Sequence, residues 1–363
     1  MNRAKLLWSY LRRSPVTGGL PVEYIVETTA KCNLYCPMCP RETHPQPKED
    51  MADAIFDRLV QDAQSTGEHM MLIGLGEPLL DPKIFDRIEY CDKHGVSTLL
   101  STNGVLLEGK NADKLLESKL EHVTFSFDGS KPESFEFYRK GAKFNRVRDN
   151  FIAFAKRKHE TGAKIQIVVQ MVRLEKNWDE VDEFLEFWSK IPGVDQVRVK
   201  NDETNLLQPE GGHAPEDWKH PCHYLWRGPV YVKHNGDVYP CCQSYMLDGA
   251  PVGRIGGEQS MQQIYDSPEM QRMRKLHAAG RGGEIDICAK CFTTIPHPLL
   301  VTGSLLLHGK WVRKALPAVE RFVNLSKGGW IRKLLTPPSK QTPPKPAAPE
   351  LVQITLPGDD TNH

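Results

Sequence analysis

Residues 32 to 39 read Cys-Asn-Leu-Tyr-Cys-Pro-Met-Cys, which places three cysteines, Cys32, Cys36 and Cys39, on one short stretch of chain. Thiolates at this spacing can bind three irons of one [4Fe-4S] cluster, and no fourth cysteine lies nearby. The fourth iron would keep an open position for a substrate or cofactor, as catalytic metal sites do. A zinc knuckle is the alternative, although zinc prefers four ligands. A disulfide explains the stretch less well, because three closely spaced cysteines cannot all pair.

Bulk composition narrows the class of protein. The chain has 363 residues, enough for one large core or two smaller ones, and its net charge of +1 does not indicate nucleic-acid binding. Nine cysteines, several in Cys-x3-Cys-x2-Cys and Cys-x2-Cys groups, favour metal binding over disulfides. No signal peptide is visible, and no apolar run reaches about 18 residues. We therefore expect a cytoplasmic protein without a membrane span.

Short β-branched runs alternate with helical stretches between residues 22 and 200. We expect strands near 22–28, 69–74, 96–101, 121–127, 164–171 and 195–200, and helices near 51–66, 82–94, 108–118, 145–160 and 178–190. This alternation is typical of right-handed βαβ units around a parallel sheet. The predicted fold class is therefore α/β, and six units are too few for a closed eight-stranded barrel.

Glycine-rich and polar segments follow the predicted strands. The cysteine stretch follows the first strand, and Gly-Leu-Gly-Glu-Pro at 74–78, Ser-Thr-Asn-Gly at 101–104 and Ser-Phe-Asp-Gly at 126–129 follow the next three. Gln170 and Met171 close the fifth. Because chemistry in parallel α/β folds gathers at the carboxyl ends of the strands, all five segments should face one mouth.

These residues resemble the radical S-adenosylmethionine (SAM) superfamily, whose signature is Cys-x3-Cys-x2-Cys. The Cys-Asn-Leu-x-Cys form of this signature resembles the one common in the branch of the superfamily that carries a C-terminal auxiliary-cluster domain, called SPASM or twitch. The resemblance implies an open, partial (β/α)6 barrel and a [4Fe-4S] cluster on Cys32, Cys36 and Cys39 that binds SAM. Reductive cleavage of SAM would then give a 5′-deoxyadenosyl radical, which abstracts hydrogen from a substrate.

The resemblance also implies SAM contacts. Gly76-Glu77-Pro78 looks like the family's Gly-Gly-Glu-Pro motif, with Leu75 in place of the first glycine. Gly76 and Glu77 are therefore expected to hold the SAM ammonium group, because glycine permits close backbone approach and a carboxylate suits a cation. A plain strand-to-helix turn is the alternative.

Three further residues are expected near SAM. Ser126 looks like the family's serine near the SAM ribose or carboxylate, and Arg139 could pair with that carboxylate, unless it is a solvated surface arginine. Met38 stands where the family often has an aromatic residue, so it is a weaker candidate for covering adenine. Thr102 and Asn103 match a Thr-Asn-Gly turn near the pocket, for which a purely structural role is the alternative.

Four more cysteines lie beyond a polar boundary at 201–221. A hairpin at 230–241, turned at Asn235-Gly236, and a helix near 259–279 could bring together Cys222, Cys241, Cys288 and Cys291. Their order resembles the short SPASM/twitch form with one auxiliary [4Fe-4S] cluster, and a structural zinc site is the alternative. We expect Cys91 to be a small buried hydrophobe. Cys242 is expected to pack, although it could replace Cys241 as a ligand.

Both ends of the chain are basic and amphipathic. The expected divisions are an N-terminal segment 1–20, a radical SAM core 21–205, an auxiliary-cluster domain 206–298, a basic segment 299–336 and a disordered Pro-rich tail 337–363. Each basic segment is either a helix docked on the protein or an anchor at the inner face of a membrane.

The sequence therefore predicts a radical SAM enzyme with an unidentified substrate. Oxidation or dehydrogenation of a small molecule, with the auxiliary cluster in electron transfer, is one candidate reaction. Modification of a peptide or protein is a second, although no leader-binding domain is evident, and a lipid substrate is a third. An electron donor such as flavodoxin or ferredoxin is expected. The non-enzyme alternative is a zinc-stabilised binding protein on an α/β scaffold.

Overall fold

The structure is a computed structural model that describes residues 1–42, 47–66, 69–201, 218, 220–246, 249–291, 293, 295 and 298–306. The predicted Pro-rich tail at 337–363 lies outside the described residues. The same holds for most of the predicted boundary at 201–221 and for the basic segment beyond residue 306.

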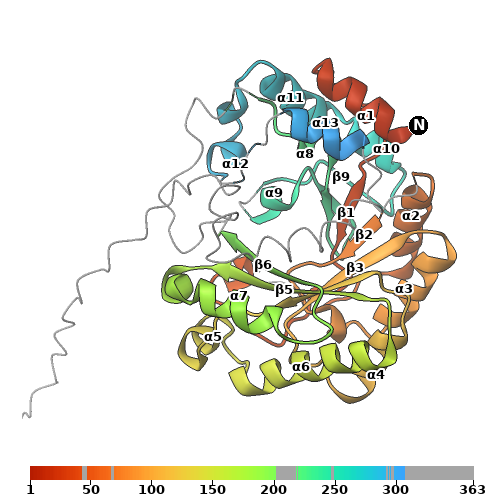
Figure 1. The fold of residues 1–363 in the computed structure, drawn as a ribbon. Helices are drawn as coiled ribbons and strands as arrows, with labels where there is room; N and C mark the ends of the chain where they lie inside the picture. The colour runs from red at the N-terminus through yellow and green to blue at the C-terminus, as the bar shows by residue number, and fades with distance from the viewer. Residues whose placement is uncertain are drawn as a thin grey trace, which may run out of the picture.

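One sheet connects the strands of the described chain, in the order β6-β5-β4-β3-β2-β1-β7-β8-β9 (Figure 1). Its strands are β1 (Glu23–Val26), β2 (His69–Leu72), β3 (Ser97–Thr102), β4 (His122–Ser126), β5 (Gln166–Arg173), β6 (Gln196–Asn201), β7 (Val230–Val232), β8 (Asp237–Tyr239) and β9 (Gly253–Arg254). The first six pair in parallel as chain neighbours. This confirms the α/β class and the six predicted strands, and the barrel is open because β6 and β9 end the order.

Helices follow these strands as the alternating pattern predicts. They are α2 (Asp53–Gln64), α3 (Ile84–Lys93), α4 (Gly109–Glu117), α5 (Pro132–Tyr138), α6 (Phe144–Thr161) and α7 (Val181–Ser189). Figure 1 shows them along one side of the strands. Helix α5 was not expected from the sequence; it has 7 residues and starts at Pro132, shortly after the segment that ends β4. A helix this short carries too little periodicity to be recognised.

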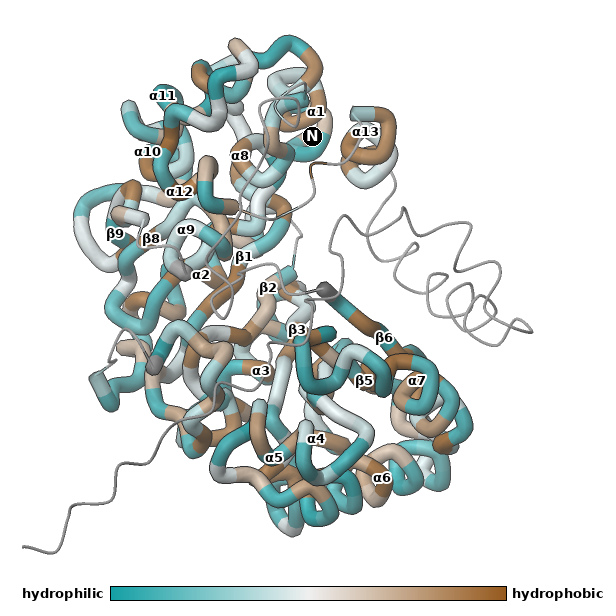
Figure 2. The backbone as a smooth tube through the Cα atoms, turned by 90° about the vertical axis from the view of Figure 1, so that its left-hand side faces the viewer, coloured by the Kyte–Doolittle hydropathy of each residue, from teal (hydrophilic) through white to brown (hydrophobic). Residues whose placement is uncertain are grey.

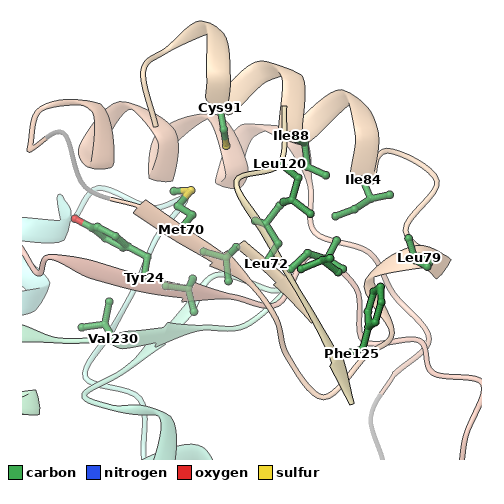
Figure 3. Close-up of a cluster of buried hydrophobic side chains, with 14 of the residues drawn as sticks. Tyr24, Met70, Leu72, Leu79, Ile84, Ile88, Cys91, Leu120, Phe125 and Val230 are labelled. Atoms are coloured by element: carbon green, nitrogen blue, oxygen red, sulfur yellow. The ribbon is translucent and has the colours of Figure 1, made fainter. Parts of the chain in front are cut away.

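The core lies between the sheet and these helices (Figure 3). Ile88 and Cys91 on α3 are fully buried and point toward Met70 and Leu72 of β2. Burying a side chain of leucine size stabilises a fold by about 1.5–3 kcal/mol. Cys91 thus lies among apolar side chains, which confirms the expectation of a small buried hydrophobe.

The C-terminal hairpin joins the same sheet. Strand β7 pairs in parallel with β1, with Ile25 opposite Tyr231, and β8 pairs antiparallel with β7. The predicted turn at Asn235-Gly236 is confirmed, since Gly236 has φ +90° and a Cβ there would lie 2.3 Å from the Ile255 carbonyl oxygen. The hairpin that carries Cys241 is therefore attached to the strand that leads into the N-terminal cysteines.

The single helix predicted near 259–279 is wrong, because the chain forms two helices there. They are α10 (Met261–Tyr265) and α11 (Pro268–Ala278). Pro268 cannot donate a backbone hydrogen bond, so it ends one helix and starts the next. The Ser267 hydroxyl accepts from the Met270 backbone N–H at 3.4 Å and caps α11.

Short helices complete the described chain. They are α1 (Asn2–Leu11), α8 (Tyr224–Arg227), α9 (Cys242–Met246), α12 (Asp286–Ala289) and α13 (Pro298–Leu306). The N-terminal helix is docked, because Leu6 and Tyr10 are buried and Tyr10 meets Trp226 edge-on at 5.9 Å. In the described part of the chain no helix is both long enough and apolar enough to cross a bilayer.

Candidate active site and auxiliary cysteine site

Cys32, Cys36 and Cys39, here called the loop cysteines, lie after β1 as free thiols. The Cys39 backbone N–H donates to the Cys36 carbonyl at 2.9 Å, which closes the turn. Burial raises the pKa of all three thiols, that of Cys36 to about 11. The charge of Arg139 acts against this shift, whereas the charge of Cys32 raises the pKa of Cys36 and Cys39 further. The three thiols therefore share one local environment.

The segment Gly74–Pro78 lies against the chain that leads into these cysteines. The Glu77 backbone N–H donates to the Lys31 carbonyl at 2.8 Å. A Cβ on Gly76 would lie 2.0 Å from the Thr29 carbonyl oxygen, so only glycine permits this approach. The strand ends β1 and β2 thus bring the two motifs together, as the expectation of a common mouth requires.

Replacing Gly76 by alanine is expected to separate the two motifs, because the new methyl group collides with backbone that cannot rotate away. We expect loss of most SAM binding and a destabilisation of about 1–3 kcal/mol, the usual cost of overpacking. Equilibrium binding of SAM to the iron-loaded protein and its thermal unfolding would measure this. Gly257→Ala is the control, since nothing lies within 4 Å of a Cβ there. Unchanged SAM affinity in Gly76→Ala would contradict the close approach.

The Glu77 carboxylate is buried and joins the ends of β2 and β3. Its Oε1 accepts from the Thr102 hydroxyl at 2.7 Å and from the Leu79 N–H at 3.2 Å, and its Oε2 accepts from the Asn103 N–H at 2.8 Å. Burial raises the pKa of Glu77, against the effect of these hydrogen bonds. The charge of Glu77 in turn raises the pKa of Cys32. The carboxylate therefore lies within electrostatic reach of the loop cysteines.

Thr102 and Asn103 thus do more than form a turn, because both donate to Glu77. The Asn103 side chain also donates to the Asn33 side chain at 2.9 Å, so it links the third strand to the cysteine loop. Sequence reasoning had named these residues only as a turn near the pocket, since their contact with Glu77 spans 25 residues of chain or more.

Ser126 ends β4, and Arg139 directly follows α5. The Ser126 hydroxyl lies 3.1 Å from that of Ser101, and Arg139 Nη2 pairs with Asp128 Oδ2 at 2.5 Å. Arg139 is not a solvated surface side chain, because only 16% of it is exposed. Burial alone would lower the pKa of Arg139, but the charges of Asp128 and Cys36 outweigh it and raise the pKa.

Met38 lies inside the cysteine loop and packs, half-buried, against the core. Gln170 and Met171, which were expected to close the fifth strand, lie within β5, because β5 continues to Arg173.

The second group of cysteines, here called the auxiliary cysteines, comes together from four places in the C-terminal part. Cys222 precedes α8, Cys241 follows β8, Cys288 lies on α12 and Cys291 follows it. Burial raises the pKa of Cys222 and Cys241 to about 12, and the charge of Cys291 raises both further. Burial also raises the pKa of the Cys288 thiol, and the charges of the other three cysteines raise it further. The four thiols therefore lie close enough for their charges to act on one another.

His277 is a contact of this group that sequence reasoning missed. Its Nδ1 accepts from the Cys222 backbone N–H at 3.3 Å, which leaves the ring proton on Nε2, 3.5 Å from Cys288 Sγ. Donors to a ligating sulfur orient it and tune the metal site. A histidine on α11, at 11 residues from Cys288 and 55 from Cys222, gives no sequence signal of this contact.

Glu27 was also missed, and it connects β1, the 74–78 segment and the hairpin. This buried carboxylate accepts from the Tyr231 hydroxyl at 2.6 Å and the Leu75 N–H at 3.0 Å, and its Oε1 lies 2.8 Å from His234 Nδ1. Burial would raise the pKa of Glu27, but these hydrogen bonds outweigh it and hold the pKa below its ordinary value. Glu27 therefore links the chain that follows β1, which leads to the loop cysteines, to β7 and the hairpin that precedes Cys241.

Comparison with known protein families agrees with this arrangement. Residues 26–187 match the radical SAM superfamily, and residues 222–292 match the SPASM iron-sulfur cluster-binding domain. The two matches together include all loop and auxiliary cysteines. The chain belongs to the radical SAM superfamily, in the branch with a C-terminal SPASM domain. Membership confirms the predicted enzyme class and its cofactors, a [4Fe-4S] cluster that works with SAM and an auxiliary iron–sulfur cluster.

Curated relatives match parts of the chain. A tungsten-containing aldehyde ferredoxin oxidoreductase cofactor-modifying protein of Pyrococcus furiosus is 27% identical over 48% of this chain and 50% of its own length. A GTP 3′,8-cyclase of Limosilactobacillus fermentum is 30% identical over 64% of each chain. Against several of the curated relatives the chain spans half of their length or less.

Solved structures show the same fold. The structure of anSMEcpe with bound AdoMet superposes with a TM-score of 0.56 at 17% identity, over 83% of this chain and 99% of that one. SuiB of Streptococcus suis, bound to its precursor peptide SuiA, also gives 0.56, at 15% identity over 70% of this chain and 67% of that one.

The donor set fits both cofactors. Three loop thiols leave one iron of a [4Fe-4S] cluster without a protein ligand, and four auxiliary thiols can saturate a second cluster. Within the described ranges, no three His, Cys, Asp or Glu side chains are drawn close enough together to hold a single metal ion. The match of residues 222–292 to an iron–sulfur cluster-binding domain is what favours iron–sulfur over zinc at the auxiliary cysteines.

Proposed function

We propose that the chain is a radical SAM enzyme that cleaves SAM reductively and removes a hydrogen atom from its substrate. The main support is a hydrogen bond that joins the 74–78 segment to the chain beside the loop cysteines. In it, the Glu77 backbone N–H donates to the Lys31 carbonyl at 2.8 Å. When bound, the three-cysteine cluster and SAM supply methionine and a 5′-deoxyadenosyl radical, at the expense of one electron from an external donor such as flavodoxin or ferredoxin.

The protein's part is to hold SAM and exclude water. Glu77 Oε1 already accepts two hydrogen bonds and Oε2 only one, so Oε2 can accept one more from the SAM ammonium group. Arg139 Nε is buried and has no hydrogen-bond partner among the described residues, which suits a SAM carboxylate. Ser126 is assigned to the ribose or carboxylate and Met38 to the adenine ring. Gly76 keeps the backbone close to the ligand.

The auxiliary cluster is assigned to electron transfer. Cys222, Cys241, Cys288 and Cys291 would satisfy all four irons, so no open position remains for SAM. These four residues would hold a cluster that supplies electron transfer, and the net reaction would then be an oxidation or dehydrogenation. His277 would support this role by its contact with Cys288.

A peptide and a small molecule are the leading substrate classes. Support for a peptide comes from the solved neighbours SuiB, bound to precursor peptide SuiA, and anSMEcpe, bound to the Cp18Cys peptide. Support for a small molecule comes from BtrN, which is bound to AdoMet and 2-DOIA and superposes with a TM-score of 0.51. A lipid is a third class, since we also propose that this enzyme contacts the inner face of a membrane with its basic ends.

Two domains follow from this assignment. The radical SAM core would occupy 21–205 and the auxiliary-cluster domain 206–298, between the basic segments 1–20 and 299–336. The proposal is supported by the pairing of β1 with both β2 and β7, which puts the junction of the two domains inside one sheet.

Anaerobic incubation with SAM and dithionite tests the function. The purified protein should carry about eight irons, four for each cluster. It should form 5′-deoxyadenosine with dithionite and none without it. Iron-loaded protein that forms no 5′-deoxyadenosine with any candidate peptide, alcohol or lipid would contradict the proposal.

A further inference from the structure

An exposed apolar groove lies between the first and last described helices. Helices α1 and α13 lie side by side at one end of the molecule in Figures 1 and 2, and the Arg3 side chain donates to the Ser304 carbonyl at 3.2 Å. The groove between them has a volume of about 320 Å³. Its lining is Arg3, Ala4, Leu7, Trp8, Leu11, Leu305 and Leu306.

The groove exposes large apolar side chains that are not needed to dock α1 on the protein. Trp8, Leu11 and Leu306 are 59%, 55% and 67% exposed, whereas Leu6 and Tyr10 on the other face of α1 already dock the helix. A concentration of large apolar side chains at one surface marks an interaction site more often than scattered single residues do. Tryptophan and leucine beside cations are typical of helices that lie in a membrane surface.

Positive charge surrounds the groove. Helix α1 and the two residues after it carry Arg3, Lys5, Arg12 and Arg13 and no acidic residue. Lys5 and Arg12 are exposed, and the Arg12 guanidinium lies 4.2 Å from the centre of the Trp8 ring. In the sequence that follows α13, residues 307–335 contain seven Lys or Arg and one acid. Both chain segments that meet at the groove therefore favour an anionic partner.

We propose that the α1–α13 groove is the surface by which this protein docks on an anionic phospholipid membrane. The apolar lining enters the boundary between headgroups and acyl chains, and Lys5 and Arg12 meet lipid phosphates. A second copy of the chain is a poorer occupant, because two such cationic surfaces repel each other. This inference deepens the proposed membrane contact and does not depend on the radical chemistry.

Sedimentation with vesicles tests the groove in the full-length, iron-loaded protein. Vesicles of phosphatidylcholine alone are compared with vesicles that also contain phosphatidylglycerol. The wild type should sediment with the anionic vesicles and be released by high salt. The triple variant Trp8→Ser, Leu11→Ser, Leu306→Ser and the double variant Lys5→Glu, Arg12→Glu should each bind at least about tenfold more weakly.

Matched controls separate this surface from general effects. Phe187→Ser, at another partly exposed aromatic residue, and the double variant Lys110→Glu, Lys164→Glu should bind vesicles as the wild type does. Formation of 5′-deoxyadenosine without vesicles should be unchanged in the groove variants, so failure of the radical function and failure of docking give different results.

Three outcomes would overturn the docking surface. If the groove variants bind anionic vesicles as tightly as the wild type does, any membrane contact must come from residues beyond 306. If the wild type does not sediment with anionic vesicles, the chain's own C-terminal residues or another protein covers the groove. A dimer that the groove variants convert to a monomer would identify the occupant as a second copy.

Discussion

Replacing Cys36 by alanine is expected to abolish the formation of 5′-deoxyadenosine. Cys36 is the buried central member of the loop cysteines, and without it only two thiols remain for the [4Fe-4S] cluster. We expect a decrease of at least about a thousandfold, which corresponds to about 4 kcal/mol in activation free energy. Anaerobic incubation with SAM and dithionite, followed by chromatography of the nucleoside product, measures it.

Cys91→Ala is the matched control for this experiment. Cys91 is fully buried on α3 among apolar side chains, so its removal costs some packing but no metal ligand. This variant should keep its iron and form 5′-deoxyadenosine at a rate close to that of the wild type. A Cys36→Ala protein with wild-type activity would show that the loop cysteines do not hold the cluster.

Replacing Glu27 by alanine is expected to cause the largest loss of stability. The change leaves the Tyr231 hydroxyl, the Leu75 N–H and His234 without their shared acceptor in a buried site. Breaking such a buried network costs about 3–5 kcal/mol. Thermal unfolding of the iron-loaded protein should show a melting temperature lower by roughly 10 °C. Loss of iron from both cysteine sites should accompany it, because Glu27 lies at their junction.

Glu49→Ala is the control for Glu27, since Glu49 is 67% exposed and 3.8 Å from the other nitrogen of His234. It should change stability by less than about 1 kcal/mol, as exposed ion pairs do. A Glu27→Ala variant as stable as Glu49→Ala would show that the buried network does not hold the two parts of the sheet together.

The same carboxylate should make the protein sensitive to acid. Because the folded-state pKa of Glu27 lies below its ordinary value of 4.5, the folded protein binds this proton less readily than the unfolded chain does. The stabilisation is therefore complete above the ordinary pKa and is lost as the pH falls through the folded-state pKa. The difference in unfolding free energy between the wild type and Glu27→Gln should shrink below about pH 4.5. A difference that stays constant down to pH 3 would contradict the assignment of the shift to Glu27.

Local patterns explain which parts of this fold could be predicted from the sequence. The loop cysteines are visible because three cysteines with the spacing of cluster ligands lie within eight residues, and the six strands are visible because each alternates with a helix. Gly76 and Glu77 could be named because their segment follows a predicted strand. All of these signals lie within one or two neighbouring elements of the chain.

Contacts between distant parts of the chain gave no such signal. Glu27 meets Tyr231 and His234 across 204 and 207 residues, and no pattern in either segment indicates the other. The pairing of Arg139 with Asp128 was missed for a different reason, because Asp128 follows a predicted strand and was grouped with the residues of its turn. The helix predicted near 259–279 was wrong because its apolar periodicity continues across Pro268.

The central claim is that SAM binds directly to an iron that the loop cysteines leave open. Electron–nuclear double resonance on the dithionite-reduced protein, mixed with SAM labelled with 15N in its amino group, tests it most directly. We predict a hyperfine coupling between the cluster and the labelled nitrogen in the wild type and in Cys91→Ala. Iron-loaded wild-type protein without that coupling, under conditions where SAM is bound, would contradict the claim.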